Sequence, residues 1–167
     1  MEAAAPPSRL DRLLAGRPPD VAHAIAASRL LFRVAHMLQA RIDRALRDFG
    51  IDMRDYLALV LISDAAVEPL RPSDLSATLD ATRTQITRLL DALEKKGLAQ
   101  RLPGSRQDRR SLHLALTDAG RNLLRQAAPS VHAAYGEGWA AIGAGRTRQA
   151  VDLLRLMHEH LGQKEAS

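Results

Sequence analysis

The sequence predicts a mainly α fold with one small β-hairpin, and three observations carry that prediction. Hydrophobic residues make up 46% of the 167 residues and aromatic residues only 3%, so we expect a core of Leu, Ala, Ile and Val. Apolar residues recur at helical spacing along most of the chain. Residues 98–116 are the exception, because leucines alternate there with other residues, as in half-buried strands.

A short helix, a tight turn and a second helix are predicted between Pro72 and Lys96. Pro72 suits the first position of a helix, and Asp80 tolerates the left-handed backbone of a turn. Thr82 followed by Gln85 is a capping-box pattern at the start of the second helix. That helix has one apolar stripe, formed by Ile86, Leu89, Leu90 and Leu93. Its other face is polar and basic, which is typical of a helix-turn-helix whose second helix enters the DNA major groove.

A β-hairpin with a basic loop is predicted directly after this helix pair. Its strands are residues 98–102 and 112–116, and its loop carries Arg106, Arg109 and Arg110. A basic loop in this place is typical of the wing of a winged helix, and it is expected to reach the minor groove or its phosphates. Phosphate would repel Asp108, which we therefore assign to orienting a neighbouring arginine. Without the wing, a helical hairpin with a solvated polar face would be the commoner interpretation.

The positive charge of the chain is concentrated in this region. Between Thr82 and Arg110 there are eight basic and three acidic residues, a surplus equal to the +5 net charge of the whole chain. A local surplus indicates a polyanion-binding site, although charge alone is equally compatible with a solvated basic face.

The candidate DNA-binding residues follow from side-chain chemistry. Arginine can donate two hydrogen bonds to guanine, glutamine can pair with adenine in the same bidentate way, and threonine hydroxyls suit phosphates or bases. The predicted set is Ser73, Thr82, Arg83, Thr84, Gln85, Thr87, Arg88, Arg106, Asp108, Arg109 and Arg110.

Two stretches of this region resemble a known family. PSDLSATLDATRTQITRLLDALEKKGL (72–98) and DRRSLHLALTDAG (108–120) are similar to the MarR family of bacterial regulators, and the resemblance covers about residues 20–162. It implies a homodimer held by the first and last two helices, a palindromic operator in double-stranded DNA, and release by a small phenolic or lipophilic effector. RRSLHLALT with Pro129, His132 and Trp139 resembles repressors of multidrug efflux pumps. Two residues depart from the pattern, because Arg71 replaces a usual Ser or Thr cap and Asp80 a common turn glycine.

The resemblance and the helical pattern together divide the chain. We expect a flexible arm at 1–19, one MarR-type domain at 20–162 and a tail at 163–167. Within the domain, residues 20–49 and 118–162 are the expected dimerisation helices, and residues 53–116 are the winged helix-turn-helix lobe.

The expected function is that of a homodimeric, ligand-released repressor. Arg33, His36 and Tyr56 are the candidate ligand contacts, and a packed dimer core with a polar rim is the alternative for each of them. A nucleoid-type architectural protein, which binds DNA without sequence preference or ligand response, is the alternative function.

Other functional classes lack support in the sequence. We find no phosphate loop, nucleophile elbow or zinc-protease motif, so we expect no enzyme, no catalytic residues and no cofactor. His158 and His160 lack the spacing of helical metal ligands, and the absence of cysteine excludes disulfides. No run of about 18 uncharged apolar residues occurs, so we expect no membrane partner and a cytoplasmic location.

Overall fold

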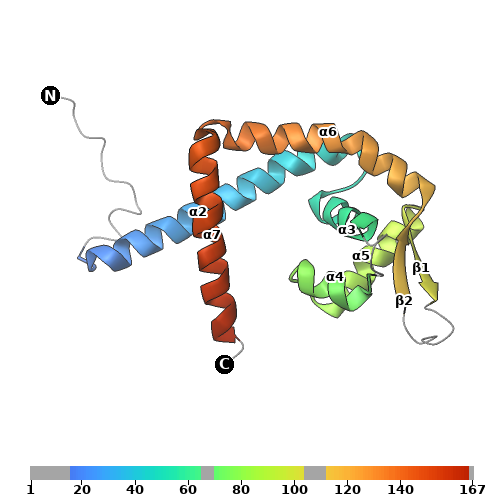
Figure 1. Cartoon of the computed structure of the whole chain (residues 1–167), viewed down its shortest axis with the longest axis horizontal. Coiled ribbons are helices and arrows are strands. Elements are labelled where there is room, and N and C mark those ends of the chain that lie inside the picture. The colour runs from blue at the N-terminus through green and yellow to red at the C-terminus, as the bar shows by residue number, and fades with distance from the viewer. Residues whose placement is uncertain (1–15, 65–69, 104–111, 166–167) are drawn as a thin grey trace. The chain divides into compact units, whose positions relative to one another are not determined.

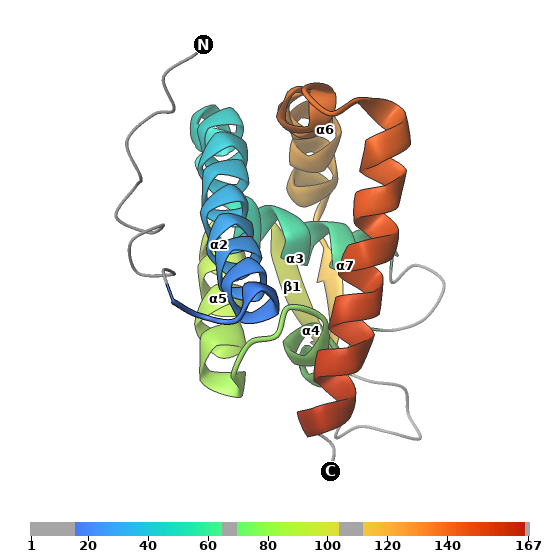
Figure 2. The same cartoon turned by 90° about the vertical axis from the view of Figure 1, so that its left-hand side faces the viewer.

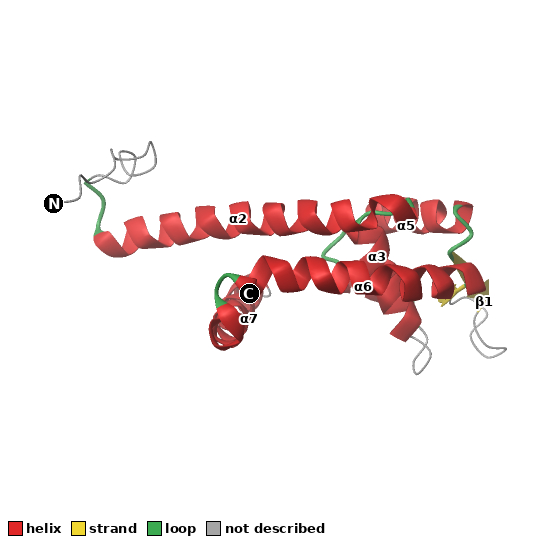
Figure 3. Ribbon diagram, turned by 90° about the horizontal axis from the view of Figure 1, so that it is seen from above, coloured by secondary structure: helices red, strands yellow, loops and turns green. Residues whose placement is uncertain are grey.

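The computed structural model describes residues 16–64, 70–103 and 112–165. Most of the predicted arm and the whole wing loop lie outside these residues. The elements, in order, are α2 (Pro19–Leu46), the 3-10 helix η1 (Arg47–Phe49), α3 (Met53–Asp64), α4 (Pro72–Thr78), α5 (Arg83–Lys95), β1 (Ala99–Pro103), β2 (Leu112–Leu116), α6 (Asp118–Ala140) and α7 (Gly143–Glu165) (Figure 1). The predicted fold class, mainly α with one antiparallel hairpin, is confirmed (Figure 3).

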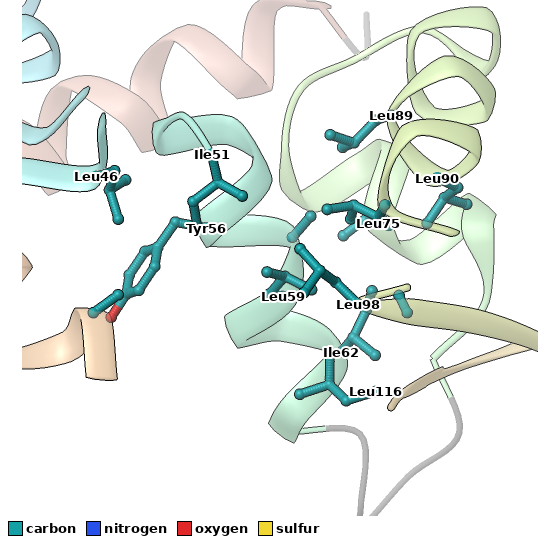
Figure 4. Close-up of a cluster of buried hydrophobic side chains, with 14 of the residues drawn as sticks. Leu46, Ile51, Tyr56, Leu59, Ile62, Leu75, Leu89, Leu90, Leu98 and Leu116 are labelled. Atoms are coloured by element: carbon teal, nitrogen blue, oxygen red, sulfur yellow. The ribbon is translucent and has the colours of Figure 1, made fainter. Parts of the chain in front are cut away.

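The chain divides into two compact units, Met1–Ala40 and Arg41–Ser167. The second unit contains the last turn of α2 and every later element. Its core is a cluster of mostly aliphatic side chains, with Tyr56 among them, contributed by the end of α2, α3, α4, α5, the hairpin and α6 (Figure 4). Leu59, Leu75 and Leu93 are each 0% exposed. Burial of each such side chain contributes about 1.5–3 kcal/mol, so the cluster can hold these elements together.

The helix-turn-helix forms as the sequence predicts. Pro72 is at the start of α4, and Asp80 has a φ of 47°, which places it in the left-handed region of a tight turn. Thr82 and Gln85 form the capping box of α5. The predicted apolar stripe of α5 is buried, which leaves the opposite face of this helix to the solvent.

The hairpin is shifted by one residue from its predicted start. β1 begins at Ala99 because the Leu98 amide still donates to the Leu93 carbonyl and closes the end of α5. In β2, Leu114 and Leu116 are buried, but Leu112 is 48% exposed, in contrast to the predicted apolar face. Leu112 pairs with Pro103 at the loop end of the hairpin, beyond the core, so burial stops before it.

Helices α6 and α7 complete the second unit. Pro129 lies inside α6, which continues from Asp118 to Ala140. Gly143 has a φ of 72°, and α7 begins at this left-handed residue and turns away from α6 (Figure 2). The described side chains of α7 are mostly exposed, including those of Leu153, Leu156 and Leu161.

The first unit contains most of α2. Its apolar side chains are also largely exposed, at 60% for Leu30, 73% for Phe32 and 62% for Met37. By length and hydropathy alone, the segment Pro19–Phe49 is comparable to a membrane-spanning helix. The sequence analysis did not identify this segment, because it considered only runs of uncharged apolar residues.

Candidate nucleic-acid interface

The exposed face of α5 carries the predicted base-reading residues. Arg83, Thr84, Thr87 and Arg88 are all exposed, on the side of the helix opposite its buried stripe. The Thr87 hydroxyl donates to the Arg83 carbonyl at 2.9 Å, which leaves its lone pairs and methyl group for an external partner. The structure therefore presents one polar, cationic face of a short and firmly packed helix.

The N-terminus of α5 is fixed by its own side chains. The backbone amide of Thr82 donates to Gln85 Oε1 at 2.9 Å, and the backbone amide of Gln85 donates to Thr82 Oγ1 at 3.3 Å. A bidentate contact with adenine needs the same Gln85 oxygen as an acceptor, so that contact would require the cap to open. The structure thus gives Thr82 and Gln85 a folding role that competes with base reading.

A shallow hollow lies between α4 and the start of α5. It measures about 530 Å³ and brings together four of the predicted DNA-binding residues, Ser73, Thr82, Arg83 and Gln85. Ser73 lies on α4, and its hydroxyl donates to Asp74 Oδ1 at 3.3 Å. The first residues of α5 line this hollow, and the positive end of a helix dipole favours an anion.

The remaining predicted DNA-binding residues, Arg106, Asp108, Arg109 and Arg110, lie outside the described residues. The described base of the wing is the pairing of Pro103 with Leu112.

Arg101 belongs to the basic surplus of the sequence, but in the structure it joins β1 to α5. Its Nη2 lies 2.8 Å from Asp91 Oδ1, its Nη1 pairs with Glu94, and its amide donates to Glu94 Oε1 at 2.8 Å. Two carboxylates therefore balance this cation, and the wing strand is fixed against the recognition helix. Asp91 and Glu94 lie three positions apart on α5, and this spacing was the sequence signal for a paired Arg101. Charge counting did not use it.

Lys96 is a second cation of the surplus with an internal partner. Its Nζ lies 2.7 Å from Asp55 Oδ2 and donates to the Gly50 carbonyl at 2.9 Å. Asp55 is only 7% exposed, and its amide donates to Asp52 Oδ1 at the start of α3. The exposed basic residues on α5 are thus Arg83, Arg88 and Lys95, and the sequence analysis did not identify the Asp55–Lys96 pair.

A groove separates α3 from α6 in the same unit. It measures about 540 Å³ and is lined by Tyr56, Val60, Leu61, Ser63, Asp64, Arg121, Leu124, Arg125 and Ala128. Of the predicted ligand contacts, Tyr56 lines this groove. Arg33 and His36 belong to the other compact unit, where both are exposed.

Tyr56 combines the two roles considered for it, because it is part of the core and also lines the groove. Burial, together with the nearby Tyr135, raises the pKa of the Tyr56 hydroxyl above its usual value. The phenol is therefore neutral at physiological pH and can act as a hydrogen-bond donor.

A helix-turn-helix with an exposed cationic second helix, followed by a hairpin fixed to that helix, defines a winged helix-turn-helix protein of the DNA-binding class. Comparison with known proteins assigns the chain more narrowly. The sequence model of the MarR family matches residues 51–112. Transcriptional repressor MprA of Escherichia coli K12 is 32% identical over 141 residues, which cover 84% of this chain and 80% of MprA.

Two solved structures agree with that assignment. CouR from Rhodococcus jostii RHA1, bound to p-coumaroyl-CoA, has a TM-score of 0.69 at 34% identity and is matched over 77% of this chain and 88% of CouR. A mutant of MarR from E. coli, complexed with operator DNA, has a TM-score of 0.74 at 25% identity, over 81% and 95% of the two chains. The chain belongs to the MarR family of transcription regulators and is not an enzyme.

Proposed function

We propose that this protein is a homodimeric repressor that reads a palindromic operator and is released from it by a small lipophilic or phenolic ligand. The observation that carries the proposal is the exposed face of α5, which presents Arg83, Thr84, Thr87 and Arg88 opposite a buried stripe. A helix of this kind fits the major groove, and the MarR neighbour solved with operator DNA supports the same use here.

The proposed contacts divide by chemistry. Arg83 and Arg88 are assigned to guanine edges, and Thr84 and Thr87 to neighbouring bases or phosphates. Ser73 and the capped start of α5, Thr82 with Gln85, are assigned to the DNA backbone. Arg106, Arg109 and Arg110 in the wing are assigned to minor-groove phosphates, with Asp108 orienting one of them. Residues 53–116 form the DNA-binding lobe in this proposal.

The second proposed partner is another copy of the chain. Helices α2 and α7 expose many large apolar side chains, whereas monomeric proteins usually expose such side chains singly. Larger exposed apolar patches mark interfaces. A membrane would be the alternative partner for α2, but Arg29 and Arg33 lie within its apolar length. Each arginine at a bilayer centre costs about 2.5–3.5 kcal/mol on insertion scales, so a protein partner is favoured. Sedimentation velocity and co-sedimentation with phosphatidylcholine vesicles separate the two.

The groove between α3 and α6 is the proposed effector site. Its volume of about 540 Å³ is typical of small-molecule sites. Its lining is mixed: four apolar side chains, Val60, Leu61, Leu124 and Ala128, lie beside Tyr56, Ser63, Asp64, Arg121 and Arg125. An apolar surface next to a neutral phenol and two arginines suits a lipophilic or phenolic molecule. CouR, which has p-coumaroyl-CoA bound, supports a phenolic ligand in this family. Arg33 and His36 on α2 stay predicted ligand contacts of their own unit, and p-coumarate is the first probe for the groove.

The function is tested by selection and competition. The wild-type protein is used to select duplexes from a randomised pool, and the selected duplex then competes with a random duplex at fixed salt. A repressor is expected to prefer the selected duplex by about 10³-fold or more. Equal affinity for both would favour the architectural alternative. Because the relatives named above are bacterial, we place this activity in the cytoplasm, with the DNA.

A further inference from the structure

Three consecutive residues at the end of the recognition helix, Lys96, Gly97 and Leu98, receive contacts from two different helices. We call them the joint. The joint closes α5, because the Gly97 amide donates to the Glu94 carbonyl and the Leu98 amide to the Leu93 carbonyl. The joint is therefore attached directly to the end of α5.

Helix α3 holds the joint through Lys96. The ammonium group contacts Asp55 Oδ2 at 2.7 Å and the Gly50 carbonyl at 2.9 Å. The Asp55 side chain is 11% exposed and that of Lys96 is 39% exposed, so the pair is partly shielded from water. This contact is charge-assisted, which makes it stronger than a neutral hydrogen bond.

Helix α6 holds the joint through its first turn. The Thr117 hydroxyl donates to the Gly97 carbonyl at 2.6 Å, and the Thr117 amide donates to the Leu98 carbonyl at 3.1 Å. At Gly120, an added Cβ would lie 2.0 Å from the Leu98 carbonyl oxygen, so only glycine permits this approach. The start of α6 is thus in direct backbone contact with the joint.

The same two helices form the walls of the 540 Å³ groove. Tyr56, which lines the groove, directly follows Asp55 in the chain, and Arg121, on the opposite wall, directly follows Gly120. A molecule that spreads the two walls pulls on both attachments of the joint.

We propose that Asp55 and Lys96 are positioning residues for DNA binding, and that their pair transmits occupancy of the groove to the recognition helix. Neither side chain is assigned to a DNA contact. This inference rests on the proposed function, because it supplies the connection between effector and operator.

Removal of the Asp55 charge distinguishes a positioning role from a purely electrostatic one, because the two roles predict opposite changes in DNA affinity. Asp55→Asn removes a carboxylate from the DNA-binding lobe, so electrostatics alone would strengthen binding to a polyanion. Positioning predicts the opposite for a specific site. We expect Asp55→Asn to bind the selected duplex about 5- to 150-fold more weakly, the range of a typical coupling, while its affinity for a random duplex does not fall. Asp48→Asn, an exposed change of the same charge on η1, is the matched control and is expected to show no loss.

Lys96→Met tests the other half of the pair, since it keeps the aliphatic stem and removes the three donors. Its loss of affinity should not add to that of Asp55→Asn, because the two residues act through one contact. All variants are compared at a temperature where circular dichroism shows each to be folded. If Asp55→Asn is folded and binds the selected duplex as tightly as wild type or more tightly, the proposal is wrong. Additive losses in the double variant would also overturn it.

Transmission from the groove is tested without a known ligand. Ala128→Trp places a large side chain in the groove and mimics occupancy, so it should weaken binding to the selected duplex. In the Asp55→Asn background the same change should have a clearly smaller effect. An undiminished effect in that background would show that the pair does not transmit the signal. If the wild-type protein selects no sequence from the pool, the proposed function itself fails, and this outcome is distinct from wild-type behaviour of Asp55→Asn.

Discussion

Leucine side chains are mostly buried in the winged helix-turn-helix and exposed in helix α7. In the first, Leu75, Leu90 and Leu93 are at most 1% exposed. In α7, Leu153 is 63% exposed and Leu156 is 65% exposed. The first region buries its apolar surface within one chain, whereas α7 leaves its apolar surface exposed. In the proposed dimer, the first region folds by itself and α7 is covered by the second copy.

The largest effect is expected from leucine truncation in the buried region. Leu75→Ala should lower the free energy of unfolding by about 2–5 kcal/mol, because it removes buried methyl groups and leaves a cavity. Urea denaturation should show this loss at every protein concentration. The matched change Leu156→Ala should cost much less at dilutions where the chain is monomeric. Equal, concentration-independent losses would contradict the comparison.

A charge in α7 should break assembly rather than folding. Leu154 is 39% exposed on the proposed dimer face, and Leu154→Asp would bury a carboxylate there. We expect sedimentation velocity to show monomer or aggregate, with helical content close to wild type for the monomer. A stable dimer that still binds DNA would show that this face is not the interface.

A change on the exposed face of α5 should affect recognition and leave folding intact. Arg83→Ala is expected to cost about 1–3 kcal/mol in binding to the selected duplex and to relax its base preference. The control is Lys95→Ala in the last turn of the same helix, which should weaken selected and random duplexes alike. Unaltered base preference in Arg83→Ala would show that the reading face is placed wrongly.

The capping box should contribute a smaller amount. Thr82→Ala removes the side chain that accepts from the Gln85 amide, and loss of such a cap costs about 0.5–2 kcal/mol. Thermal unfolding measures this loss directly. Thr84→Ala, two residues further along the chain on the exposed face, lacks the cap contact and should be nearly neutral for stability.

The smallest effect concerns pH and Tyr56. The folded pKa of Tyr56 lies above its unfolded value, so its contribution to stability is complete below about pH 10, the ordinary value for tyrosine. Stability should then fall as the pH rises through the folded pKa, because the unfolded chain gives up this proton first. Tyr56→Phe should show a flatter decline in urea titrations above pH 10. A steeper decline in the variant would contradict the assignment.

Local sequence rules predicted the winged helix-turn-helix well. Asp80 and Thr82 act through contacts within a few residues, and the apolar stripe of α5 follows from helical spacing, so both patterns are visible in the sequence. Leu112 was predicted as part of an apolar face, yet it is exposed, because alternation does not show where the core ends.

The contacts that hold the site together could not be predicted from local patterns. Lys96 and Asp55 are 41 positions apart, and nothing near either residue indicates the other. Charge counting included Lys96 and Arg101 in the basic surplus of residues 82–110, although both are paired with carboxylates. The sequence gives the number of charged residues, but their partners are known only from the fold.

In the proposed repressor, two recognition helices, one from each copy of the chain, read one duplex as a pair. The most direct test is the symmetry of the duplex that the wild-type protein selects from a randomised pool. A paired reading head predicts an inverted repeat with half-site centres about 10 base pairs apart, or a multiple of that spacing. A single asymmetric element, or no enrichment in the pool, would contradict it.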